Sequence, residues 1–105
     1  GDTVICCQFI FKPAEYDDEF HRLDAQIDKY ARSLPGFDRV EVWQSREGDL
    51  INAVYYFADG ESLAQLARFP QHLEAKSKVN RWYERYRIVV SEVTTTYGDD
   101  RQRLS

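Results

Sequence analysis

Apolar and polar residues alternate with two different periods along the chain, and the first stretch predicts a strand followed by a helix. Residues 4–11 are apolar on both faces of a strand, which Lys12-Pro13 should end. From Tyr16 to Leu34 the apolar residues recur every three or four positions, as in an amphipathic helix with one buried stripe. Acidic residues at the start of this helix suit its dipole, and Pro35-Gly36 should stop it.

The rest of the chain predicts two strands, two helices and a last strand. A second strand over 39–45 and a third over 50–58 flank the turn 46–49, with Gly48 in a positive-φ position. Asp59 is a candidate N-cap for a short helix over 62–68. Pro70 should begin a longer helix that runs to about Tyr86. Residues 87–97 form the last predicted strand, and 98–105 a polar tail.

This order of elements, β-α-β-β-α-β, predicts an α+β fold of the ferredoxin-like class. A single domain over 1–97 should contain a four-stranded antiparallel sheet with both helices on one face. Antiparallel sheets usually have one polar face, yet the first and third strands are apolar on both. The uncovered face therefore needs a partner, and a second copy of the same sheet predicts a homodimer.

The composition of the 105 residues limits the function classes further. A net charge of −4 argues against a nucleic-acid surface. No stretch approaches the roughly 18–20 apolar residues that span a bilayer, and no signal peptide is recognisable, so we expect a cytoplasmic protein without membrane contact. Adjacent Cys6 and Cys7 should be free thiols that act as small apolar side chains, and no zinc-site spacing is present.

His72 is the strongest candidate for chemistry. It lies in the first turn of the helix that begins at Pro70, on the same stripe as Ala75 and Val79. The positive helix end and Lys76 both disfavour its protonation, so we expect a neutral imidazole that can accept a proton or bind iron. The alternative is a partly buried histidine bonded to backbone. His21 lies off the buried stripe of its helix and should be a surface residue.

Aromatic and amide side chains form the second group of candidates. They suit a flat, apolar aromatic ligand, although packing in the core or dimer interface explains each ring individually. The amides lie within apolar strands, where a buried amide needs a partner, so they could orient a substrate or bridge strands. The candidate substrate-binding residues are Gln8, Trp43, Asn52, Tyr56, Phe69, Trp82 and Tyr83.

Several short motifs resemble the antibiotic biosynthesis monooxygenase (ABM) superfamily. They are the run Phe57–Leu63 leading to Phe69-Pro70-Gln71-His72, together with Pro35-Gly36-Phe37 and Trp43. The resemblance covers about residues 3–97. It implies a dimeric α/β barrel with a pocket between sheet and helices in each protomer. Members of the superfamily include monooxygenases that oxidise polycyclic phenols without a cofactor, others that degrade heme, and others without known activity.

The heme-degrading branch allows a comparison residue by residue. It uses an Asn on the first strand, a Trp on the second helix and a His that matches His72. Gln8 falls about where the Asn would be, and the Trp position falls near Gln65 or Leu66. The resemblance therefore disfavours heme degradation and leaves heme binding through His72 open.

These observations leave three candidate functions. The first is a monooxygenase that needs no cofactor and acts on a small phenolic or enol substrate, with His72 as general base and Asn52 or Gln8 bonded to the developing oxyanion. The second is a non-catalytic, dimeric small-ligand-binding protein. The third is a heme site with His72 as axial ligand.

Overall fold

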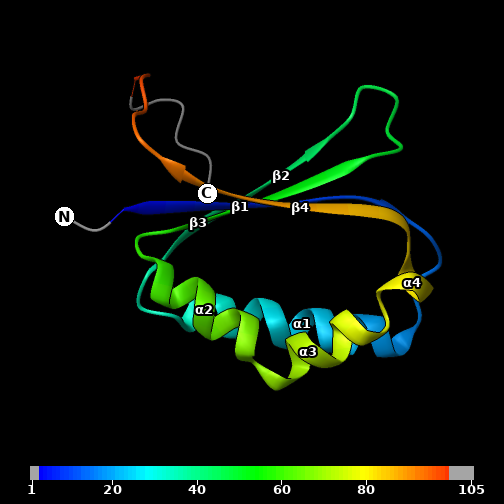
Figure 1. The fold of residues 1–105 in the computed structure, drawn as a ribbon. Helices are drawn as coiled ribbons and strands as arrows, with labels where there is room; N and C mark the ends of the chain where they lie inside the picture. The colour runs from blue at the N-terminus through cyan, green and yellow to red at the C-terminus, as the bar shows by residue number, and fades with distance from the viewer. Residues whose placement is uncertain (1–2, 100–105) are drawn as a thin grey trace.

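The computed structural model describes residues 3–99 and contains a four-stranded antiparallel sheet with helices on one face (Figure 1). The sheet order is β2-β3-β1-β4. This order and the antiparallel pairing confirm the predicted ferredoxin-like fold. The elements are β1 Val4–Pro13, α1 Asp18–Ser33, β2 Phe37–Gln44, β3 Ile51–Phe57, α2 Gly60–Arg68, α3 Pro70–Ser77, α4 Val79–Trp82 and β4 Tyr83–Val93.

The first helix begins and ends where the sequence predicts, within two residues. Asp17 is its N-cap, and the Asp17 carboxylate accepts a hydrogen bond from the Phe20 amide at 2.8 Å. Leu34 adopts an extended conformation just before Pro35, which ends the helix. The buried stripe of α1 includes Phe20, Leu23 and Ala31.

Gly36 links the end of α1 to the start of α2. Its amide donates to the Ser62 hydroxyl at 2.9 Å, and its carbonyl accepts from the Ala58 amide at 2.6 Å. Asp59 caps α2 by accepting from the Ser62 amide at 2.8 Å, as predicted. A β-carbon on Gly36 would lie 2.4 Å from the Ser62 hydroxyl oxygen, so this close approach needs glycine. Gly48, at φ 81°, supplies the positive φ that was predicted for the β2–β3 turn.

The region after Pro70 corrects one prediction. The expected helix from Pro70 to Tyr86 breaks at Lys78 (φ −115°, ψ 12°), and the strand begins at Tyr83 rather than at Arg87. From this point side chains alternate between faces, so Tyr86 pairs with Phe11 and Ile88 with Phe9 on β1. These strand pairings outweigh a spacing that also fits a helix. The strand ends at Val93 rather than Tyr97, and the expected tail from 98 lies mostly outside the described residues.

The core lies between the sheet and the helical layer in two clusters. The first joins buried Ala31, Leu34, Phe57 and Leu66 of α1, β3 and α2. The second joins buried Phe20, Leu23 and Trp82, with Ala75 of α3 packed against it. Both clusters hold the helices on the same face of the sheet (Figure 1). None of the described helices is long and apolar enough to cross a membrane.

Candidate functional site

Strand alternation divides the candidate residues between the two faces of the sheet. Ile5, Tyr55 and Phe57 pack against the first core cluster, so they point toward the helices. Their neighbours in sequence, including Cys6 and Tyr56, must point the other way. We call these sides the helix face and the open face.

The eight candidate residues therefore do not form one site within a protomer. Four candidates lie on the open face: Gln8, Trp43, Asn52 and Tyr56. Gln8 lies two residues after Cys6 on β1, and Asn52 lies four residues before Tyr56 on β3. Trp43 is on the same face because it pairs with Asn52. The helical layer carries His72 and Phe69, and Trp82 and Tyr83 pack in its second core cluster. Gln8 and Asn52 thus lie across the sheet from His72, where they cannot bond an oxyanion beside it. The prediction that Asn52 or Gln8 acts beside His72 within one protomer is therefore wrong.

His72 has an unsatisfied buried nitrogen. The side chain is half-buried, and its Nδ1 atom contacts no solvent and has no hydrogen-bond partner among the described residues. It lies one turn before Ala75, which packs against the second core cluster, so this side of α3 faces the interior. Burial lowers the pKa of His72 and Lys76 lowers it further, while the backbone of Ala67 acts in the opposite direction. The imidazole is therefore neutral at pH 7, as predicted.

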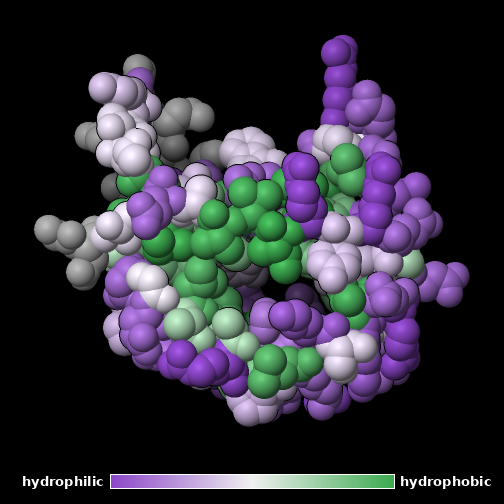
Figure 2. Space-filling view, viewed as in Figure 1, coloured by the Kyte–Doolittle hydropathy of each residue, from purple (hydrophilic) through white to green (hydrophobic). Residues whose placement is uncertain are grey.

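Aromatic rings line the helix face beneath β1 and β4. The Phe9 ring lies 5.1 Å from that of Tyr83 and 6.0 Å from that of Tyr86, measured between centroids. Farther along β4, Ile88 and Val90 are about half exposed on the same side. Figure 2 shows a hollow between the sheet and the helical layer, next to a hydrophobic area of the surface. Phe9 is a lining residue that the sequence did not single out, although strand alternation from Ile5 places it there.

Two tyrosines on the helix face keep their protons. Burial, with smaller contributions from the carboxylates of Asp28 and Asp24, raises the pKa of Tyr55 to about 12. Burial also raises the pKa of Tyr83 strongly, with smaller contributions from Tyr16 and Asp24. Both phenols are neutral at physiological pH and can donate a hydrogen bond. Tyr55 is therefore a second residue of this face that the sequence did not single out as a candidate.

Phe69 and Trp82 are engaged in packing. The Phe69 ring stacks on that of Tyr30, with centroids 4.0 Å apart. Trp82 is 2% exposed, and its indole N–H donates to Asp17 at 3.2 Å. These two candidates therefore shape the helical layer and have no free polar group to offer a ligand.

The open face has its own depression, of about 230 Å³, near the β2–β3 turn. Asn52 lies in its lining, and its amide nitrogen donates to the Gln8 side chain at 2.9 Å. The Asn52 Oδ1 atom is buried and has no hydrogen-bond partner within the described part of the chain. Trp43, half exposed, forms part of the rim, and Tyr56 lies under the Arg39 guanidinium 3.9 Å away. The lining also includes Ile10, Gln44, Ser45, Leu50 and Ile51.

The residues do not assemble the heme site that the resemblance describes. Gln8, at the approximate place of the required Asn, faces away from the helical layer that carries His72. Within residues 3–99 no group of His, Cys, Asp and Glu side chains is placed to hold a metal ion. Cys6 and Cys7 are both free, and they point to opposite faces as predicted.

Comparison with known proteins identifies the fold. No protein-family model matches the sequence, and no curated protein matches it either. Among solved structures, it is similar to SnoaB, a cofactor-independent oxygenase from Streptomyces nogalater, with a TM-score of 0.69, 14% identity and coverage of 94% of this chain and 100% of that one. It is also similar to a conserved protein from Methanosarcina mazei Go1, with a TM-score of 0.68, 17% identity and coverage of 85% of this chain and 91% of that one. A third similar structure is a protein from Chloroflexus aurantiacus J-10-fl assigned to the antibiotic biosynthesis monooxygenases. Its TM-score is 0.60 and its identity 15%, with coverage of 90% of this chain and 97% of that one. These structures share between 14% and 17% identity with the chain, so they show its fold alone, which is the fold expected from the resemblance.

Proposed function

We propose that the protein is an oxygenase that needs no cofactor, acts on a small phenolic or enol substrate and uses His72 as general base. The observation that supports this most directly is the buried Nδ1 of His72, which has no partner among residues 3–99. Buried polar atoms are nearly always bonded, so an orphaned one on the interior side of α3 suits a ligand's hydroxyl group. A neutral imidazole is also the form that a base requires.

The chemistry follows from these groups. His72 accepts the substrate's hydroxyl proton, and the resulting anion gives one electron to dioxygen. The two radicals combine at a ring carbon that carries hydrogen, and the peroxide O–O bond then breaks. In the balance, the substrate loses two hydrogens, the hydroxyl proton and the one on that carbon, and gains one oxygen atom, while the other oxygen atom leaves as water. Tyr83, which stays protonated, donates a hydrogen bond to the substrate oxygen, and such donors are worth about 2.7–4 kcal/mol when preorganised.

Oxygen uptake with a panel of anthrone-like and naphthol-like phenols tests this proposal. On a substrate that the wild type turns over, His72→Gln should lower kcat by about 10²- to 10⁴-fold, the usual contribution of a general base. His21→Gln is the matched control, since His21 is exposed on α1. Full turnover by His72→Gln on that substrate would refute the role of His72.

A ligand-binding protein without catalysis is the second candidate. The hollow and its aromatic lining serve this function equally well, and no base is needed. Saturable binding of a phenol, monitored by tryptophan fluorescence, with no oxygen uptake across the panel would favour it. Heme is a third candidate that the residues do not fit, and the absence of a Soret shift with micromolar hemin would dismiss it.

We further propose that two copies associate through their open faces. The face exposes half of Trp43, and the buried Asn52 Oδ1 has no donor among residues 3–99, so a second copy can supply one. Trp43→Glu should give a monomer in sedimentation experiments. Val42→Glu is the matched control, because Val42 is the neighbouring exposed residue and points to the helix face. A monomeric wild type at about 100 µM, a concentration well above the Kd range of stable dimers, would refute the dimer.

A further inference from the structure

Helix α3 carries His72, yet it buries none of its own side chains. Of its residues, only Ala75 packs against a core cluster, and α3 lies mainly against α1 and α2. It is bounded on both sides by residues with non-helical dihedral angles, Phe69 at ψ 127° and Lys78 at φ −115°. Core packing therefore constrains the position of α3 weakly.

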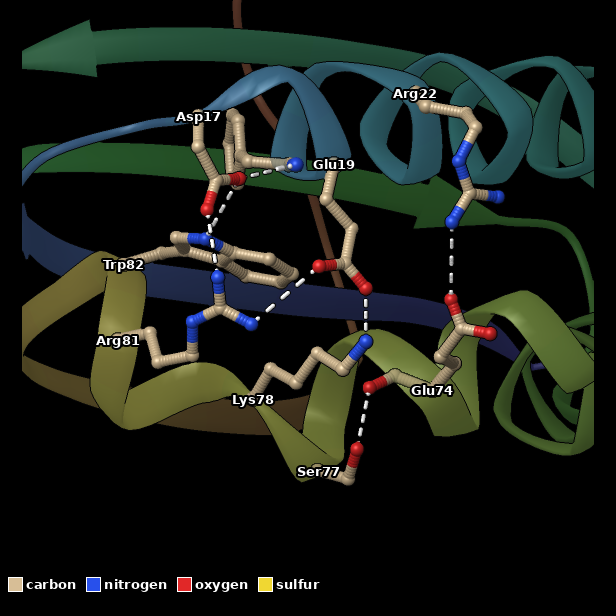
Figure 3. A network of polar contacts seen from close by, with 9 residues as sticks. Asp17, Glu19, Arg22, Glu74, Ser77, Lys78, Arg81 and Trp82 are labelled. Carbon is tan, nitrogen blue, oxygen red and sulfur yellow. Dashed lines mark hydrogen bonds and ion pairs between the residues drawn. The ribbon is translucent and has the colours of Figure 1, made fainter.

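Charged side chains join α3 and the turn after it to α1. Arg22 bonds Glu74 at 3.3 Å, and Lys78 pairs with Glu19 (Figure 3). Arg81 bonds Asp17 at 2.8 Å and reaches Glu19 at 3.4 Å. We call this set of six residues the polar seam: Asp17, Glu19, Arg22, Glu74, Lys78 and Arg81.

Aromatic side chains anchor the chain before and after α3. Phe69 stacks on Tyr30 before α3, and the buried Trp82 bonds Asp17 after it. Between these two anchors, the Arg22–Glu74 and Glu19–Lys78 pairs are the contacts of the polar seam that hold α3 to α1. Figure 3 shows the two pairs side by side, with the acidic and basic partners exchanged between the helices.

We propose that the polar seam sets the position of α3, so that Glu19 and Arg22 are positioning residues for His72. The inference rests on the proposed function only for its effect on turnover. The docking of α3 is measurable without a substrate.

Charge reversal at one pair tests the proposal. Glu74→Arg replaces an attraction to Arg22 by repulsion, and both side chains are about half exposed, so the fold should persist. Exposed pairs of this kind are worth about 0.2–1 kcal/mol, so amide exchange within α3 should accelerate by about 1.5- to 5-fold or more. The NMR titration of His72 should move toward the ordinary range, because an undocked imidazole is better hydrated.

Two variants separate docking from general effects of charge. Arg22→Glu with Glu74→Arg restores the pair in reverse and should restore both readings. Glu61→Arg is the matched control, because Glu61 pairs with Arg68 at the same 3.3 Å inside α2. It should leave α3 exchange and the His72 titration unchanged.

Three results would overturn the inference. They are unchanged α3 exchange and His72 titration in Glu74→Arg, an equal response in Glu61→Arg, or failure of the double variant to recover. If Glu74→Arg unfolds, the same two measurements can be made on the wild type in rising salt. At about 1 M salt the screening length falls to about 3 Å, which weakens the ion pairs of the polar seam. A His72 titration and α3 exchange independent of salt would then refute it. Loss of activity in His72→Gln tests the proposed function separately.

Discussion

A methyl group on Gly36 should destabilise the protein out of proportion to its size. The new β-carbon would lie 2.4 Å from Ser62 Oγ, which is about 1.0 Å closer than the 3.4 Å at which ordinary contact begins. It would also lie 2.8 and 2.9 Å from the carboxylate oxygens of Asp59. Ser62 is 2% exposed, so its hydroxyl cannot move freely into solvent, and the partly buried Asp59 carboxylate is held by its bond to the Ser62 amide.

The expected cost follows from the two bonds that must be disturbed. Displacing the Ser62 hydroxyl leaves the buried Gly36 amide unpaired, at about 1–3 kcal/mol. Displacing Asp59 weakens the N-cap of α2, at about 0.5–2 kcal/mol. Because the two responses share one relaxation, we expect Gly36→Ala to lower the free energy of unfolding by about 2–4 kcal/mol.

Urea unfolding followed by circular dichroism at one fixed protein concentration measures this loss. Gly60→Ala is the matched control, since it adds the same methyl beside Asp59 with no atom within 4 Å. It should be neutral or slightly stabilising, because alanine favours a helix. Gly36→Ala should also cost less in a Ser62→Ala background, where the closest clashing atom is gone. A midpoint for Gly36→Ala equal to that of Gly60→Ala would refute the steric reasoning.

Three further predictions concern titration and exposure. The pKa of His72 is lowered by folding, so the unfolded chain binds the His72 proton more tightly and stability should fall as the pH drops below the ordinary value of 6.5. Urea midpoints at pH 5.5 and 7.5 should therefore differ less in His72→Gln than in the wild type. The pKa of Tyr55 is raised from 10.0 to about 12, so stability should fall as the pH rises above 10, and Tyr55→Phe should weaken that fall in alkaline denaturation curves; an equal fall would contradict the burial of this phenol. In Trp82→Phe, the remaining Trp43 is 51% exposed, so iodide should quench its fluorescence in dilute protein and less at high concentration if the open faces associate; quenching independent of concentration would count against that interface.

The sequence predicted the fold well because its period signals are strong. The stripe of α1, the turn glycine Gly48 and the cap Asp59 are local features, and each one was where the sequence placed it. The helix expected from Pro70 to Tyr86 failed for a nonlocal reason. Val79, Trp82, Tyr83 and Tyr86 fit a helical spacing, and the first two do lie in α4. Pairing with β1 instead makes Tyr83 and Tyr86 part of a strand, and that pairing is not visible in a local pattern.

The candidate site could be predicted only in part. The direction of the His72 pKa shift could be predicted from Lys76, which is a local effect. Burial, the larger cause, depends on how α3 packs and is not visible in the local pattern. The separation of His72 from Asn52 depends on which face of β3 meets the helices. Composition alone does not decide this, because the strand is apolar on both sides. The hydrogen bond of Asn52 to Gln8 likewise needs the register of two strands.

The arrangement of β4 also limits how the sheet can grow. It is an edge strand, and it alternates arginines on the open face with Tyr86 and Ile88 on the helix face. A copy that added antiparallel around a two-fold axis at Tyr86 would set Arg85 opposite Arg87 on both strands, where like charges repel. The apolar edge is therefore guarded against propagation into a continuous fibre, as natural sheets commonly are. The same pair of arginines that leaves the edge unpaired keeps this aromatic-rich strand from seeding aggregates.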